Sequence, residues 1–421
     1  MNIPGLGMRW AGRGTMAAFA LLLAAAGMQT GATAAVRSTA AAGPSDPYSP
    51  TYHHPYRRGV VPSRPVAAKM RGWAAQHHGT PLTGAAPRAA AASGPHLTYG
   101  GGNPSTGVGV TTGPPKVYLV FYGSQWGADS TNGNGDLTFP NDPAGEAPYL
   151  QEFFKGVGTG GERWSGVMTQ YCDGVSKGAS SCPSGSAFAG YPTGGALAGV
   201  WADGSIASPY RASGFDLASE ADQAAQHFGN TDAAANRDAQ YIIVSPPGTD
   251  PDSWLEQGFC AWHDWNGDAS LEGGPAPSSA GDIAFTNLPY QPDAGIGCGQ
   301  DFVNTGSKGA LDGVSIVAGH EYAETITDQE PGTVNGTTPV LPYGWFDANF
   351  FLENADICAW LPPGADGGSM DLATATGTFA VQTTWANDAG VETPSGCEAG
   401  HKLDGVTPAN TVTVSLTSSR N

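Results

Sequence analysis

The chain has 421 residues and a formal net charge of −19, from 18 Lys and Arg against 37 Asp and Glu. The charge is uneven, because residues 1–96 hold nine bases and one acid while the rest of the chain is strongly acidic. Phosphate contacts need a basic surface, so this acidity excludes nucleic acid as a partner. It fits an exported protein that self-repulsion keeps in solution.

Residues 1–35 have the pattern of a secretory signal peptide. Arg9 and Arg13 precede the apolar run TMAAFALLLAAAGM, which is short for a membrane span, and GATAAVRS then offers small residues for cleavage. We therefore expect a secreted, extracellular protein. We also expect a monomer that makes no membrane contact once the signal is removed.

Residues 36–112 form a basic segment rich in Pro, Ala and Gly. Such a composition buries little apolar surface, which favours a disordered linker. The alternative is a basic pro-segment that lies on an acidic enzyme. The pairs His53-His54 and His77-His78 in this segment could reach a metal.

The remaining residues, 113–421, are expected to form one globular metallopeptidase-like domain. Strands and helices alternate in it, which predicts an α/β or α+β fold with a central mixed sheet and long Gly- and Asn-rich loops. Asp312 is expected to cap the last helix. The predicted strands are 115–123, 239–248, 377–388 and 410–419, and the predicted helices are 148–157, 216–230 and 309–328.

The cysteine content agrees with export. Six cysteines follow the leader, and an even number in a secreted chain indicates three disulfides. Sequence order alone allows about 15 pairings. The simplest is sequential, which joins Cys172 to Cys182, Cys260 to Cys298 and Cys358 to Cys397.

The sequence GHEYAETITD carries the most specific chemical pattern. His320 and Glu324 stand one helical turn apart on the same face, so their side chains can converge on one ion. Glu321 lies about 100° round the helix, where a carboxylate can reach a water molecule beside that ion. Zinc accepts carboxylate oxygen as well as imidazole nitrogen. The pattern therefore predicts zinc ligands at 320 and 324 and a catalytic base at 321, although an acidic helix can match it by chance.

A third zinc ligand is expected from the acids in GWFDANFFLENADICAW. Glu353 and Asp356 stand three residues apart. We expect Glu353 to bind the ion and Asp356 to orient His320 from behind, with the reverse assignment as the alternative. His263, in CAWHDW, is a further candidate.

Calcium is a second candidate cofactor. The loops DWNGDASLE (264–272) and NGNGD (132–136) place oxygen ligands at alternate positions, as calcium loops do. The first loop lacks the Gly and Glu of the EF-hand spacing.

Four stretches together resemble a known family. PKVYLVFYGSQW, GFCAWHDW, LDGVSIVAGHEYAETITD and ENADICAW are similar to an exported bacterial family distantly related to the phosphate-induced, EXORDIUM-like proteins of plant cell walls. The resemblance runs from about residue 114 to 400. It implies an extracellular protein with one shared fold. The plant proteins are known as growth-linked wall proteins, so the resemblance leaves enzymatic activity open.

Two functions follow as expectations. The first is a secreted zinc-dependent peptidase-like hydrolase acting on peptides or proteins. The second is a non-catalytic extracellular protein that binds cell-wall material.

Overall fold

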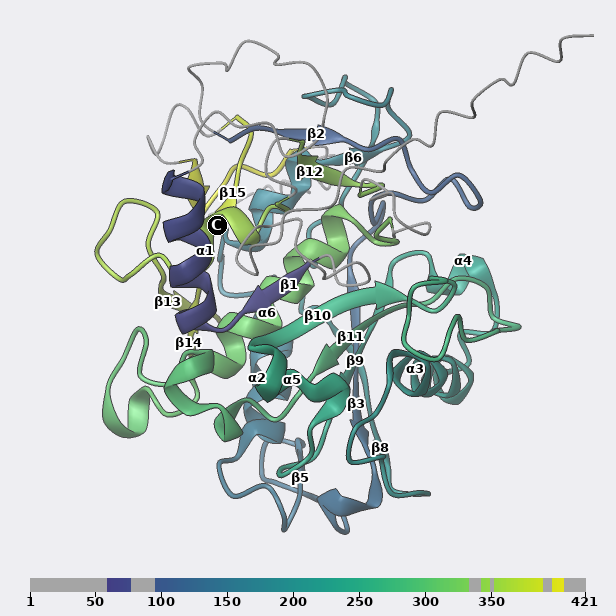
Figure 1. The fold of residues 1–421 in the computed structure, drawn as a ribbon, viewed down its shortest axis with the longest axis vertical. Coiled ribbons are helices and arrows are strands. Elements are labelled where there is room, and N and C mark those ends of the chain that lie inside the picture. Colours follow the sequence, from purple (N-terminus) through teal and green to yellow (C-terminus); the bar gives the residue numbers. More distant parts are fainter. Residues whose placement is uncertain (1–58, 77–94, 333–341, 349–351, 389–395, 405–421) are drawn as a thin grey trace, which may run out of the picture. The chain divides into compact units, whose positions relative to one another are not determined.

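A mixed six-stranded sheet forms the centre of the fold (Figure 1). Its strand order is β1-β10-β11-β9-β3-β8, and β11, β9, β3 and β8 run parallel to one another. β10 pairs antiparallel with β11, and β1 pairs antiparallel with β10. In chain order the strands are β1 Val60–Pro62, β3 Lys116–Tyr122, β8 Leu197–Asp203, β9 Ala239–Val244, β10 Phe259–Trp265 and β11 Ala284–Leu288.

The computed structural model describes residues 59–76, 95–332, 342–348, 352–388 and 396–404. All of these lie in one compact unit of the chain, Ala41–Asn421. None of the helices in these ranges has the length and apolar character needed to cross a membrane.

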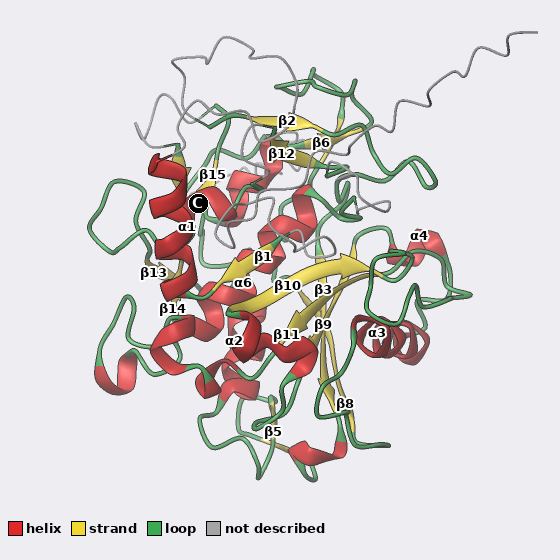
Figure 2. Cartoon of the chain, in the orientation of Figure 1, coloured by secondary structure: helices red, strands yellow, loops and turns green. Residues whose placement is uncertain are grey.

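Helices cover both faces of the sheet (Figure 2). α3 packs on one face against β9 and β11, whereas α6 packs against β10 and β11, with α2 beside it. β9 reads AQYIIV and is buried throughout, as expected for a strand covered on both faces. The helices are α1 Arg64–Gln76, α2 Glu146–Gly156, α3 Gly214–Phe228, α4 Ala233–Asn236, α5 Trp254–Gln257 and α6 Asp312–Thr327.

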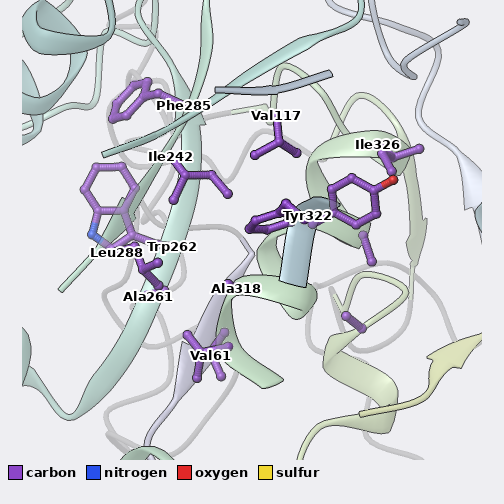
Figure 3. Close-up of a cluster of buried hydrophobic side chains, with 14 of the residues drawn as sticks. Val61, Val117, Ile242, Ala261, Trp262, Phe285, Leu288, Ala318, Tyr322 and Ile326 are labelled. Carbon is purple, nitrogen blue, oxygen red and sulfur yellow. The ribbon is translucent and has the colours of Figure 1, made fainter. Parts of the chain in front are cut away.

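α6 is buried on every side. It lies between the sheet, α2 and β14, so it has no face left for solvent. Figure 3 shows Ala318, Tyr322 and Ile326 of this helix in one apolar cluster with sheet residues. At Gly319, a Cβ would come within 3.2 Å of Trp164 and 3.4 Å of Phe153. The glycine thus lets the aromatic rings pack closely against the helix.

Within the described residues, five two-stranded sheets accompany this core. They are β2 Leu97–Tyr99 with β12 Trp345–Asp347, β4 Ser130–Thr131 with β5 Leu137–Thr138, β6 Cys172–Asp173 with β7 Ala187–Phe188, β13 Met370–Ala373 with β14 Thr378–Val381, and β15 Thr384–Trp385 with β16 Cys397–Glu398. Long loops connect them, as the glycine and asparagine content predicts.

The three disulfides have the sequential pairing, so that prediction is confirmed. Each closes a loop and can add about 2–4 kcal/mol to the stability. The bridge from Cys260 to Cys298 fixes β10, and the bridge from Cys358 to Cys397 fixes the 3₁₀ turn Asp356–Cys358.

Some element boundaries differ from the predictions. Asp312 is the first residue of α6 and does not cap it; its carboxylate instead accepts hydrogen bonds from the backbone of Val303 and Asn304 in the preceding loop. The predicted strand 377–388 is split into β14 and β15. The predicted strand 410–419 lies outside the described residues. Part of the predicted linker or pro-segment is folded, since it contributes β1, α1 and β2.

One buried carboxyl group lies between α3 and the end of β8. Glu220 is fully buried and interacts with Asp203. Burial, and then the charge of Asp203, raises the pKa of Glu220 from 4.5 to about 8. The folded protein therefore binds this proton more tightly than the unfolded chain does. Tighter proton binding stabilises the folded state at low pH, and this contribution to stability is lost as the pH rises from about 4.5 to 8.

We expect Glu220→Gln to stabilise the protein at alkaline pH, because glutamine keeps the shape of the side chain and cannot ionise. Thermal unfolding at pH 8 should give a Tm higher by about 2–4 °C, with the gain shrinking toward pH 4.5. The exposed Glu256→Gln is the control. Equal Tm values for Glu220→Gln and the unmodified protein at pH 8 would contradict the expectation.

Candidate metal centre

Three predicted residues lie together on α6. His320, Glu321 and Glu324 are all fully buried. His320 Nε2 lies 3.1 Å from Glu324 Oε1, as the spacing of one helical turn predicts. The helix can present these side chains because close packing on every side holds it in place.

Asp356 joins His320 and Glu324. Its Oδ1 lies 3.7 Å from His320 Nε2, and its backbone N–H donates to Glu324 Oε1 at 2.9 Å. Glu353 lies farther round the site, where its Oε2 is 3.7 Å from His263 Nε2. The backbone N–H of Glu353 donates to Asp356 Oδ2 at 3.1 Å. The geometry therefore favours Asp356, the alternative assignment, as the partner of His320 and Glu324.

His263 enters the site from β10 and is also fully buried. Its Nδ1 lies 3.2 Å from Glu321 Oε2 and 3.9 Å from Glu324 Oε2. Its Nε2 lies 3.1 Å from the carbonyl oxygen of Asp328. The Glu324 carboxylate thus lies between two imidazole rings that are 57 residues apart in the sequence.

These side chains make two overlapping sets of potential metal ligands. One is His320, Glu324 and Asp356, and the other is His263, Glu321 and Glu324. Within each set the ligand atoms lie within 4.8 Å of one another. Imidazole nitrogen and carboxylate oxygen are donors that zinc accepts, so the residues fit a zinc ion.

Gln382 orients His320, a role that the sequence analysis expected of Asp356. Gln382 Nε2 donates to the carbonyl oxygens of Ala355 and Thr383, which turns its Oε1 toward His320 Nδ1 at 3.0 Å. Because Oε1 only accepts, Nδ1 carries a proton and donates it. Nε2 is then directed at Glu324 and Asp356. The one sequence signal for this role is a polar residue between the apolar and β-branched positions of AVQTTW.

The contact between His320 and Glu324 is incomplete without a cation or a second proton on the ring. With Nδ1 protonated, a neutral ring faces Glu324 Oε1 with its acceptor nitrogen. In the described parts of the chain, neither His320 Nε2 nor Glu324 Oε2 has a hydrogen-bond partner. A buried polar atom of this kind costs about 1–3 kcal/mol, so a bound cation would stabilise the site.

The pKa shifts in the site reflect four carboxyl groups that lie close together. Burial, then the charges of Glu324 and Asp356, raises the pKa of Glu321 well above its usual value. Burial and Glu324 raise the pKa of Asp356 to about 8. Burial lowers the pKa of His263 to about 4, whereas for His320 the nearby carboxylates outweigh burial and raise the pKa. The group thus holds excess negative charge that protons or a metal ion must balance.

In both candidate calcium loops, carboxylate oxygens take part in hydrogen bonds or ion pairs within the protein. In the loop 132–136, the Asp136 carboxylate pairs with Lys155 Nζ at 2.5 Å and accepts from Asn132. In the loop 264–272, the Asp264 and Asp268 carboxylates accept backbone N–H groups of Trp265 and Ser270. Lys155 supplies the positive charge at the first loop.

Comparisons with family models, with curated proteins and with solved structures gave no match to this chain. The chemistry of the site is that of a cluster of imidazoles and carboxylates, the donor groups that zinc accepts.

Proposed function

We propose that this protein is a secreted zinc-dependent hydrolase of the peptidase type. The observation that supports it is the contact at the centre of the site, where His320 Nε2 and Glu324 face each other at 3.1 Å. Three buried glutamates, the partly exposed Asp356 and two buried imidazoles surround that point. A divalent cation there would balance the charge and occupy both acceptor atoms at once.

In this proposal His320, Glu324 and Asp356 hold the ion, with Glu353 as the alternative third ligand. Bound zinc would polarise a substrate carbonyl and make water more acidic. Glu321 has no ligand role in this set, and it lies one residue from His320 with its carboxylate at His263. It would accept the proton of the attacking water, and the protonated carboxyl group could then donate to Nδ1 of His263, whose Nε2–H donates to the Asp328 carbonyl.

The second function, a non-catalytic extracellular protein that binds cell-wall material, is supported by a different observation. The His263, His320, Glu321 and Glu324 side chains are fully buried, as is common for a structural ion. The resemblance to EXORDIUM-like wall proteins points the same way. A metal bound without hydrolysis would favour this function.

Metal analysis tests the proposal most directly. We expect the purified protein to contain about one zinc ion per chain. Removal with dipicolinate should abolish hydrolysis of a mixed peptide library, and zinc should restore it while calcium does not. Hydrolysis that persists after complete zinc removal would refute the zinc mechanism. Tight zinc with no hydrolysis of any peptide, also in a variant whose β1 has left the edge of β10, would support the binding function.

A further inference from the structure

β1 is an added edge strand beside the candidate site. It lies at the end of the six-stranded sheet, and among the described strands its one partner is β10, with Val60 opposite Trp262 and Val61 opposite Ala261. Pro62 ends the strand at a register irregularity, and proline is tolerated in edge strands and at bulges. Without β1, β10 would present a free edge next to His263.

The backbone of this strand touches the site itself. At Gly59, a Cβ would lie 2.0 Å from His263 Cε1 and 2.8 Å from Glu324 Oε2, and the residue has a φ of +64°. The Gly59 backbone thus lies directly against the His263 ring and the Glu324 carboxylate, and β1 packs on α6, which carries Glu321. Only glycine fits at position 59, because any Cβ there would overlap the His263 ring. The chain at 59–61 therefore occupies the space directly over the proposed base and ligands.

Separate contacts anchor the strand on each side. Val61 is fully buried and belongs to the apolar cluster that contains Ala261 of β10 and Ala318 of α6 (Figure 3). Trp360 Nε1 donates to the Pro62 carbonyl at 2.7 Å. Arg64 begins α1, and its guanidinium lies 4.6 Å from the Phe302 ring centre.

Charge complementarity extends these contacts. Residues 59–76 carry Arg64, Lys69 and Arg71 and no acid, whereas the chain after residue 96 is strongly acidic. Opposite charge favours docking of this segment on the body of the protein. Pairing by main chain, one buried apolar anchor and charge complementarity are the features of a peptide that binds by adding a strand to a sheet.

We propose that β1 occupies the place of the substrate, and that residues 59–76 hold the site closed. The inference rests on the proposed function for the identity of the site, and it adds the class of substrate that the site would bind. The substrate would be an extended polypeptide that runs antiparallel to β10, with glycine at the position of Gly59 and an apolar residue at the position of Val61. Access would require β1 to leave the edge of β10.

The test uses two valine substitutions in the full chain. Gly59→Val places a side chain into His263, so it should displace β1. Gly72→Val in α1 is the matched control, because a Cβ there meets nothing within 4 Å. The probe is a labelled synthetic peptide with the sequence RRGVVPSRPV of residues 57–66. Amide hydrogen exchange of β1 and β10 reports whether the strand has left.

We expect Gly59→Val to speed exchange in β1 by at least about 100-fold, because its pairing is lost. It should bind the labelled peptide, whereas Gly72→Val and the unmodified protein should bind at least about 10-fold more weakly. A peptide with valine in place of its glycine should fail to bind. Arg64→Ala, which removes one surface anchor, should shift exchange and binding in the same direction to a smaller extent.

Two results of the exchange and binding measurements would overturn the inference: β1 that stays protected in Gly59→Val, or β1 that leaves while the peptide does not bind. Hydrolysis is measured separately on the same variants. Peptide binding without hydrolysis would support the inference and refute the proposed hydrolase. Hydrolysis by the unmodified protein at the same rate as by Gly59→Val would show that β1 does not close the site.

Discussion

Glu321→Gln is expected to lower peptide turnover by at least about 100-fold while leaving the zinc content unchanged. Glutamine keeps the size of the side chain and its contact with His263 Nδ1, which lies 3.2 Å from Glu321 Oε2. It cannot accept a proton from water, so the variant loses only general-base catalysis. Turnover is measured on the full chain once a cleaved peptide has been found, with zinc measured on the same samples.

The matched control for this substitution is Glu146→Gln. Glu146 is also a fully buried glutamate on a helix, but it lies on α2 and accepts from the backbone of Gln291. We expect full turnover in this control. Loss of zinc together with turnover in Glu321→Gln would instead identify Glu321 as a ligand in the set with His263 and Glu324. Full turnover in Glu321→Gln would exclude it as the base.

The parts of the site that lie on α6 could be predicted because their geometry is local. A helix fixes residues four apart on one face, so His320 and Glu324 had to meet once the helix formed. The fold class was accessible for a similar reason. Short apolar runs rich in β-branched residues and ended by prolines, such as residues 239–244, favour buried strands, and they alternate with helical patterns.

The rest of the site depends on contacts between distant parts of the chain. Gln382 follows β14 and reaches His320 across 62 residues, and nothing in its neighbourhood marks it as an orienting group. His263 was a candidate, but its position against Glu321 follows from the place of β10 in the sheet. The choice between Glu353 and Asp356 depends on the turn that the Cys358–Cys397 bridge fixes.

β1 shows the limit of composition as evidence. Residues 36–112 are rich in Pro, Ala and Gly, a composition that favours disorder. Within that segment Gly59, Val61 and Pro62 match the needs of an edge strand over a crowded site: no side chain, one apolar anchor and no N–H at the end. A short stretch can therefore fold when the surface that receives it is already formed.

His320→Ala is expected to abolish zinc binding, and with it any hydrolysis that depends on zinc. The substitution removes the one imidazole whose Nε2 faces both Glu324 and Asp356, at 3.1 and 3.7 Å. Loss of a direct nitrogen ligand should exceed the roughly 10- to 100-fold cost of removing an outer-shell partner, so zinc affinity should fall by more than about 100-fold.

Titration of zinc into apoprotein, competed by a chelator, measures the loss of affinity. His227→Ala is the control, because His227 of α3 stacks on Trp201 of β8 and lies outside the ligand sets. Added imidazole should restore part of the zinc binding in His320→Ala, since it can enter the space that the side chain leaves. A simple packing role for His320 predicts no such rescue. If His320→Ala kept its full zinc affinity, the ion would have to be held by His263, Glu321 and Glu324, and Glu321 could not then serve as the base.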